Sequence, residues 1–232
     1  MNNRLLLVTV ATGYVGGRLV RELVASESQV RVLVRDASKI IDATWHDQVD
    51  VIEGDAFDIS DLRRALTGVH TAYYLLHSLN SGKNFAQTEE QMATVFATAA
   101  QECGVKQIVY LGGIANDKAT SAHLSSRVQV GHTLASLGTP TIEMRAGIVI
   151  GSGSASFEML RHLTERLPIM TTPKWVKNRT HPIAIRDVIW YLSQSAELEK
   201  PVSGIFDIGG LDVLTYAEMM NTFAKVAGLR RR

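Results

Sequence analysis

Residues 5–20 read LLLVTVATGYVGGRLV, and this stretch decides the fold. An apolar run ends at Thr9, glycines follow at Gly13, Gly16 and Gly17, and apolar residues then recur at helical spacing. This order predicts a strand, a glycine-rich turn and a helix. The N-terminus of such a helix directs free N–H groups and the positive end of its dipole at the turn. The sequence therefore predicts a site for an anion such as a diphosphate.

The turn departs from the usual dinucleotide pattern at one position. Val10 stands where the first glycine of G-x-x-G-x-x-G is expected. A β-branched residue resists positive φ, and its two methyls come close to the path of the phosphates. We therefore expect a dinucleotide site with weakened affinity, and the alternative is a structural glycine turn that holds no ligand.

Length and composition restrict the class of protein. A chain of 232 residues suits one sizeable α/β domain, or a core with a small lobe. The 46% apolar and 20% charged fractions are typical of a globular protein. With 24 basic and 23 acidic residues, no overall charge favours nucleic acid or an anionic membrane. A basic cluster at residues 230–232 is more typical of a solvated end than of a nucleic-acid tail, so we expect no nucleic-acid partner.

Cysteine usage and hydropathy indicate the compartment. Cys103 is the only cysteine, so no intrachain disulfide forms and a reducing compartment is expected. No apolar run approaches the roughly 20 residues that span a bilayer, and no signal peptide is recognisable. We therefore expect a cytoplasmic protein. The seven histidines show no metal-ligand spacing, so we expect no metal site. The chain stops directly after a predicted helix, as a fragment of a longer protein would.

Short apolar strands alternate with amphipathic helices along the chain. One helix has Ser60 as its expected N-cap, and a longer one carries a buried face from Phe85 to Cys103. This alternation predicts an α/β fold of the Rossmann type, a doubly wound parallel sheet with right-handed crossovers. We assign residues 1–150 to the nucleotide-binding core and residues 151–232 to a small lobe with elements that return to the core. The further strands are expected at residues 29–34, 49–53, 71–76 and 107–111.

Cofactor specificity is expected to depend on the end of the second strand. Arg35 lies there, about twenty residues after the last glycine of the turn, where an NAD-selective site has an acidic residue. A guanidinium suits a 2′-phosphate, and Lys39 follows one helical turn later, so we expect NADP in preference to NAD. Asp36 could still bind a ribose. Asp55, after the third strand, could accept a hydrogen bond from the adenine amino group.

The chain resembles the atypical short-chain dehydrogenase/reductases of the NmrA-like branch. Eight segments carry the resemblance in the family's order: VTVATGYVGGRLV, VRVLVRD, GDAFD, AYYLLHS, IVYLGGI, MRAGIVIGSG, HPIAIRDV and FDIGGLDVLTYAEM. The resemblance implies a cofactor across the C-terminal strand ends, with residues 151–179 and 204–210 over the substrate cleft. The cofactor-binding residues predicted from the pattern and the resemblance are Thr9, Gly13, Tyr14, Val15, Gly16, Arg35, Lys39, Asp55, Ala56, Leu76, His77 and Ser78.

The catalytic residues of this superfamily are missing as a set. Carbonyl reduction there uses a Ser after the fifth strand, a Tyr that donates a proton and a Lys four residues later that lowers the pKa of the Tyr. This chain has Gly112 and Gly113 at the serine position, and HLSSRVQV at residues 123–130 where the Tyr and Lys are expected. His77 is the candidate substitute, because an imidazole titrates near neutrality. A packed structural histidine is the alternative.

Two functions remain open from the sequence. The first is an NADP-dependent oxidoreductase that uses unconventional acid–base groups on a small-molecule carbonyl or enone. The second is a non-catalytic regulator or assembly factor that senses NADP and presents a surface to a protein partner. The loss of the Ser, Tyr and Lys favours the second, and the general activity of the superfamily favours the first. The fold alone does not choose between them.

Overall fold

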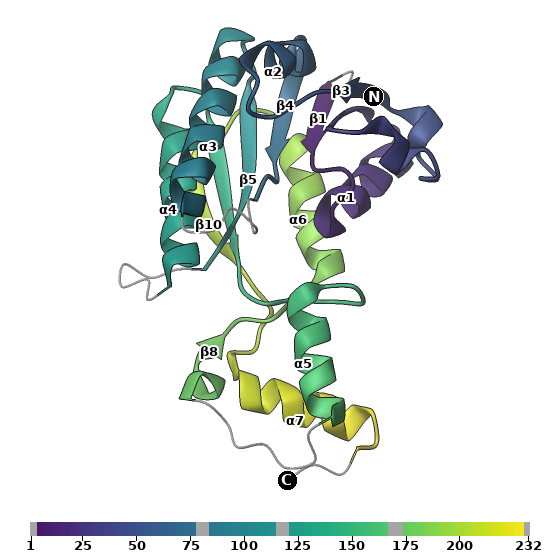
Figure 1. Cartoon of the computed structure of the whole chain (residues 1–232), viewed down its shortest axis with the longest axis vertical. Coiled ribbons are helices and arrows are strands. Elements are labelled where there is room, and N and C mark those ends of the chain that lie inside the picture. The colour runs from purple at the N-terminus through teal and green to yellow at the C-terminus, as the bar shows by residue number, and fades with distance from the viewer. Residues whose placement is uncertain (1–3, 78–83, 115–120, 167–173, 230–232) are drawn as a thin grey trace. The chain divides into compact units, whose positions relative to one another are not determined.

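The computed structural model describes residues 4–77, 84–114, 121–166 and 174–229 (Figure 1). Its main element is a seven-stranded sheet in the order β10-β6-β5-β4-β1-β2-β3. The pairs β1–β2, β2–β3, β1–β4 and β4–β5 are parallel. The doubly wound α/β fold predicted from the sequence is confirmed. The strands of this sheet are β1 (Leu5–Thr9), β2 (Gln29–Val34), β3 (Asp50–Glu53), β4 (Val69–Tyr74), β5 (Gln107–Gly113), β6 (Thr141–Ala146) and β10 (Gly204–Ile208).

Helices cover both faces of this sheet. Figure 1 shows α2, α3 and α4 on one side, and α1 and α6 on the other. The strand order reverses between β1 and β4, so the switch point at which doubly wound sheets bind ligands lies at the carboxyl ends of these two strands. The helices are α1 (Tyr14–Ala25), α2 (Ile59–Leu66), α3 (Phe85–Glu102), α4 (Ala122–Ser136) and α6 (Ile185–Ala196), with short 3-10 turns η1 (Ala37–Ile40) and η2 (His46–Gln48).

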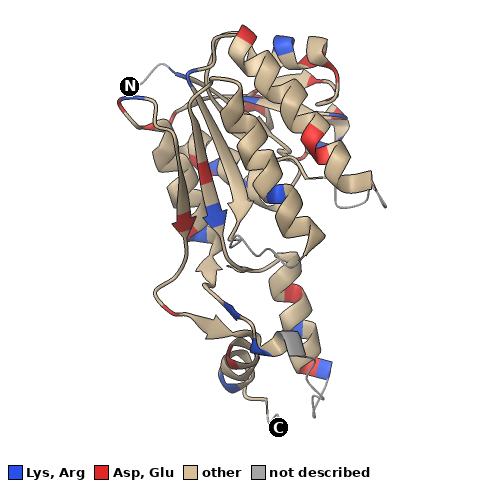
Figure 2. Cartoon of the chain, turned by 90° about the vertical axis from the view of Figure 1, so that its left-hand side faces the viewer, with Lys and Arg blue, Asp and Glu red and all other residues tan. Residues whose placement is uncertain are grey.

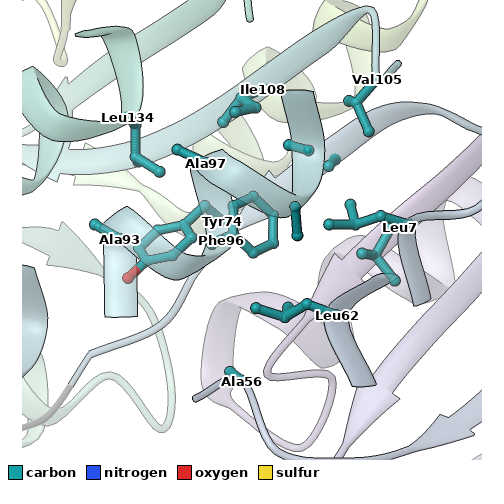
Figure 3. Close-up of a cluster of buried hydrophobic side chains, with 14 of the residues drawn as sticks. Leu7, Ala56, Leu62, Tyr74, Ala93, Phe96, Ala97, Val105, Ile108 and Leu134 are labelled. Carbon is teal, nitrogen blue, oxygen red and sulfur yellow. The ribbon is translucent and has the colours of Figure 1, made fainter. Parts of the chain in front are cut away.

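Two adjacent tyrosines in β4 join the sheet to the helices on its two faces, because successive side chains of a strand point in opposite directions. Tyr74 packs edge to face on Phe96 of α3, with ring centroids 5.0 Å apart (Figure 3). The hydroxyl of Tyr73 donates to the Leu192 carbonyl of α6 at 2.9 Å. Burial raises the pKa of both phenols well above its usual value. Both tyrosines therefore have a packing role.

The chain divides into two compact units. The first comprises Met1–Arg145 and Ile189–Asp207, and the second Ala146–Val188 and Ile208–Arg232. The second unit has its own core, to which Leu160 of α5 and Met219 and Met220 of α7 contribute. The elements of the second unit are α5 (Ala155–Arg166), η4 (Lys174–Lys177), α7 (Tyr216–Val226) and the strand pairs β7 (Val149–Ile150) with β9 (Ile183–Ala184) and β8 (Arg179–Thr180) with β11 (Leu214–Thr215).

Two local expectations differ from the structure. The N-cap of α2 is Asp58 and not Ser60, because the Asp58 carboxylate accepts from the amides of Ser60 and Asp61 at 2.7 and 3.2 Å. The resemblance assigns residues 204–210 to a lobe over the substrate cleft, whereas Gly204–Ile208 forms β10, an edge strand of the main sheet. This strand has five residues that do not alternate between buried and exposed, so it lacks the period-two pattern that marks a half-buried strand in a sequence.

Candidate nucleotide-binding site

A cavity of about 530 Å³ lies at the carboxyl ends of β1 to β4. This volume is in the usual range for small-molecule sites. The loops after four neighbouring strands contribute to it, and α3 adds Thr88 and Met92. The predicted site residues that line it are Thr9, Arg35, Asp55, Ala56, Leu76 and His77. Thr12, Phe57, Thr88 and Met92 also line the cavity and were not predicted from the sequence. Phe57 could have been predicted, because it directly follows Asp55 and Ala56.

A second, smaller hollow of about 270 Å³ lies beside the glycine turn. The predicted residues Gly13 and Lys39 line this hollow and not the first cavity, and Thr12 lines both. The described residues that line this hollow include three cations, Arg18, Arg21 and Lys39, and no acidic residue.

The remaining predicted residues lie elsewhere. Tyr14, Val15 and Gly16 form the first turn of α1 and line neither the first cavity nor the second hollow. The ring of Tyr14 is covered by the guanidinium of Arg18, 4.1 Å from its centroid. Ser78 lies outside the described residues.

Thr9 holds the ends of two strands together. Its hydroxyl donates to the Tyr73 carbonyl at 2.9 Å and accepts from the Leu75 amide at 2.9 Å. Both hydrogen bonds are buried, and the Thr9 side chain is inaccessible to solvent. Thr9 therefore fixes the spacing of β1 and β4 at the switch point, and its hydroxyl is already engaged within the protein.

The glycine turn has the backbone of a dinucleotide-binding turn, although Val10 is not glycine. Val10 has φ +56°, in the left-handed region that glycine adopts readily. A non-glycine residue pays roughly 1–2 kcal/mol for this conformation. A Cβ at Gly16 would come within 3.0 Å of the Val10 carbonyl oxygen, and a Cβ at Gly13 would lie 3.0 Å from the Val10 Cγ1. Gly13 and Gly16 are therefore required by the close approach of Val10.

Arg35 and Asp36 occupy different environments after β2. Arg35 is exposed on the lining of the first cavity, and no acidic side chain in the described part of the chain forms an ion pair with it. The Asp36 carboxylate caps η1, because it accepts from the Ser38 hydroxyl and amide at 2.6 and 3.1 Å. These hydrogen bonds hold the pKa of Asp36 below its usual value. This arrangement favours a phosphate at Arg35 over a ribose at Asp36.

The loop after β3 is fixed by its own carboxylates. The Asp55 carboxylate accepts from the Phe57 amide at 3.0 Å, and the Asp61 carboxylate accepts from the Asp55 amide at 2.9 Å. Gly54 is needed here because an added Cβ would lie 2.8 Å from the Asp61 side chain. The loop is thereby held in one conformation on the cavity wall, with Asp55 and Ala56 both on the lining.

His77 is half-buried on the lining of the first cavity. Burial, together with the nearby positive charge of Arg127, lowers the pKa of His77 to about 3. The imidazole is therefore neutral at physiological pH. The reason for proposing His77 as an acid–base group, a pKa near neutrality, does not hold in this environment.

Gly113, at the position of the missing serine, faces an arginine. A Cβ at Gly113 would lie 3.3 Å from Leu124 Cδ2 and 3.7 Å from the Nη1 atom of Arg127. The neighbouring Gly112 faces the Glu143 carboxylate, which forms a buried ion pair with Arg145 at 2.7 Å. The structure therefore places charged groups where the superfamily has its serine.

The described residues contain no metal-binding cluster and no helix that could span a membrane. No group of three or more His, Cys, Asp or Glu side chains among them could hold a metal ion. None of the described helices is long and apolar enough to cross a membrane. In the view of Figure 2, acidic and basic residues are interspersed along the helices and strands.

A doubly wound sheet, a glycine turn before α1 and a cavity at the strand ends define an NAD(P)-binding Rossmann protein. The chain belongs to the NmrA-like family, whose family model matches residues 2–230. The resemblance noted from the sequence is thereby confirmed.

Known proteins of similar sequence or structure agree with this class. The ceramide reductase of Caulobacter vibrioides is 25% identical over 230 residues, which cover 97% of this chain and 71% of the reductase. The NADP(H) complex of Citrobacter sp. triphenylmethane reductase has a TM-score of 0.80 at 18% identity, over 98% of this chain and 77% of that one. MoeE5, solved with UDP-glucuronic acid and NAD, has a TM-score of 0.80 at 18% identity, over 98% and 83% of the two chains. The structural matches show the fold.

Proposed function

We propose that this protein binds NADP(H) in the first cavity and uses it to reduce a small-molecule carbonyl compound. The observation that carries the cofactor choice is Arg35, which lines the cavity without an acidic partner among the described residues, while Asp36 caps η1. A charge-assisted hydrogen bond to a 2′-phosphate would satisfy this guanidinium. Two proteins similar to this chain are reductases by name, and one of them was solved with NADP(H).

The residues of the cavity fit such a cofactor. Gly13, the N-cap of α1, makes no side-chain hydrogen bond to the helix, so the first amides of α1, which lie outside the lining of the first cavity, would donate to a diphosphate held at the glycine turn. The loop at Asp55 and Ala56 suits the adenine, and Leu76 and His77 suit the nicotinamide ribose. When bound, NADPH would supply a hydride. The protein would position it and exclude water, and the neutral His77 would accept hydrogen bonds without competing for protons near neutral pH.

Arg35→Asp tests the cofactor choice. We expect wild-type protein to bind NADPH roughly 10- to 100-fold more tightly than NADH, and Arg35→Asp to reverse this preference. Isothermal titration calorimetry with both cofactors measures the two ratios. Arg21→Asp is the matched control, because Arg21 lines the second hollow and not the first cavity. Equal wild-type affinities for NADPH and NADH would contradict the assignment, and loss of the preference only in Arg21→Asp would move the phosphate to the second hollow.

A second function is favoured by one observation. Gly112 and Gly113 provide no serine hydroxyl, and residues 123–130 provide neither the Tyr nor the Lys of the superfamily. A protein that keeps the cofactor site without this set could sense NADP and regulate or assemble a partner. NADPH oxidation with a panel of carbonyls, quinones and enones separates the two functions. Saturable turnover supports the reductase, and tight NADPH binding without turnover supports the sensor.

We also propose that the protein works in the cytoplasm. The support is its single free cysteine, Cys103, which suits a reducing compartment. Cell fractionation with an antibody against the native chain tests this proposal, and recovery in a membrane or secreted fraction would contradict it.

A further inference from the structure

Arg127 of α4 is a half-buried cation without an ion-pair partner among the described residues. Its side chain lies against Gly113, with Cδ and Nη1 each 3.7 Å from the position that a Cβ of Gly113 would occupy. The neighbouring Arg145 differs, because Glu143 neutralises it in an ion pair whose side chains are 14% and 5% exposed. On the neighbouring helix α3, the carboxylate of Glu89 accepts a hydrogen bond from the Ser126 hydroxyl.

The location of Arg127 connects it to the cofactor cavity. Gly113 ends β5 and His77 follows β4, and these two strands pair in parallel, so both residues lie at the same edge of the sheet. His77 lines the first cavity, and the charge of Arg127 acts on its imidazole. The hydroxyl of Tyr110 in β5 donates to the Arg127 carbonyl at 3.1 Å, which fixes this turn of α4 on the sheet. Neither Gly113 nor Arg127 lines the first cavity itself, so Arg127 places its positive charge beside the His77 end of this cavity.

A guanidinium in such a place suits one kind of ligand group. Its planar fork forms two parallel hydrogen bonds with a carboxylate, and it stays charged at every physiological pH. A half-buried cation gains more from a permanent negative charge than from a neutral carbonyl oxygen, because the local dielectric is lower than in water. The glycines at positions 112 and 113 leave no side chain of β5 to compete for the guanidinium.

We propose that Arg127 binds a carboxylate of the substrate, so that the substrate class is a carbonyl compound that carries a carboxylate, such as a 2-oxo acid. This inference rests on the proposed reductase function and deepens it. The carboxylate would lie against Gly113 and Arg127, and the reducible carbonyl next to it would face the His77 end of the cavity. A second cation in this part of the site, Arg145, is already neutralised by Glu143 and would not take part.

A binding experiment tests Arg127 without turnover. The probes are benzoate and benzamide, which share a shape and differ in charge, titrated calorimetrically into protein saturated with NADP⁺. We expect benzoate to bind, Arg127→Met to weaken it roughly 10- to 100-fold, and Arg127→Lys to weaken it less, because lysine keeps the charge and loses the fork. Arg166→Met is the control, since Arg166 is an exposed arginine at the end of α5. NADP⁺ affinity should change less than about threefold in all variants.

A turnover experiment separates this inference from the reductase proposal. Phenylglyoxylate and its methyl ester are compared as substrates for NADPH oxidation, and kcat/KM for the acid should exceed that for the ester in wild type only. Benzoate binding that depends on Arg127 without turnover would uphold the carboxylate site and contradict the reductase. Equal rates for acid and ester, unchanged in Arg127→Met, would uphold the reductase and overturn the carboxylate site. Loss of NADP⁺ binding in a folded Arg127→Met would overturn it too, since Arg127 would then hold the cofactor.

Discussion

Val10 combines a backbone conformation that suits glycine with a side chain that lines the cofactor cavity. The backbone conformation affects folding stability, and the side chain affects cofactor affinity. The left-handed backbone is present without a ligand, so its cost of roughly 1–2 kcal/mol lowers folding stability rather than affinity. The two methyls occupy cavity space, so they lower affinity. Val10 therefore does not abolish the turn, and its two effects can be measured separately.

At Val10 we expect the usual order of stability, alanine above glycine, to be reversed. Glycine is ordinarily less stable than alanine by roughly 0.5–1 kcal/mol within regular structure, but at φ +56° we expect Val10→Gly to be more stable than Val10→Ala by about 1 kcal/mol. Urea denaturation measures the difference. Both variants remove the methyls, so both should bind NADPH more tightly than wild type. Tighter binding in the glycine variant alone would mean that backbone strain, and not the methyls, limits affinity.

His77 should make the protein sensitive to acid. Its pKa is about 3 in the folded protein, mainly because of burial, and about 6.5 in the unfolded chain. As the pH falls from about 6.5 towards 3, the unfolded chain binds a proton that the folded protein does not, so stability falls. We expect His77→Gln to lose less thermal stability than wild type between pH 7 and pH 5. His132→Gln, an exposed change on α4, is the control. Equal losses in wild type and His77→Gln would show that His77 titrates normally.

At the scale of elements, α4 approaches the sheet closely at a glycine. A Cβ at Gly131 would come within 3.0 Å of the Glu143 carboxylate, which is buried in β6 and paired with Arg145. The helix can therefore pack against this buried ion pair only because position 131 has no side chain. The close packing of α4 at Gly131 also keeps Arg127, on the same helix, next to Gly113. The position of the candidate carboxylate site therefore depends on how this helix packs.

Gly131→Ala should destabilise the protein, although alanine is the better helix former. Overpacking against the Glu143 carboxylate costs about 1–3 kcal/mol, and the better helix propensity of alanine offsets roughly 1 kcal/mol, so we expect a net loss of up to about 2 kcal/mol. Chemical denaturation measures it. The same substitution in a Glu143→Ala background is the control, because the obstructing carboxylate is then absent. A loss of equal size in both backgrounds would mean that the contact with Glu143 is not responsible.

At the scale of the whole molecule, the chain is built as two units with separate cores. Every described residue that lines the first cavity belongs to the first unit. The core of that unit, which includes Leu7 and Leu134, shares residues with the lining of the first cavity, and Ala56 is one of them. Figure 3 shows Ala56 among the other side chains of this core. Cofactor binding should therefore stabilise the first unit directly.

Hydrogen exchange should locate this stabilisation. With NADPH bound, we expect slower amide exchange in residues 9–17, 33–36 and 54–57, and little change in α5 and α7. Mass spectrometry of peptides from protein with and without NADPH measures this pattern. The Arg35→Asp variant with NADPH serves as the control for weak binding. Protection of α5 or α7 as strong as that of the glycine turn would contradict a cofactor site confined to the first unit.

The sequence by itself determined the order and type of most elements. The apolar run before Thr9, the glycines after it and the alternation of strands with helices are local patterns, and local patterns fix secondary structure and fold class. They also identified Arg35 and Asp55 on the cavity lining, because each follows a strand directly and parallel strands bring their carboxyl ends to one edge. The missing Ser, Tyr and Lys were visible in the same way.

Only the tertiary structure decided which charges remain unpaired and which groups are buried. Arg127 lies against Gly113, and its charge acts on His77, because α4, β5 and β4 pack together, and no spacing along the chain contains that information. The pairing of Arg145 with Glu143 is local, because the two residues are two positions apart in β6 and share one face of the strand. The pKa of His77, in contrast, follows from burial, and burial depends on what surrounds a side chain in three dimensions. A pattern along one dimension cannot supply those surroundings, since they come from elements far apart in the sequence.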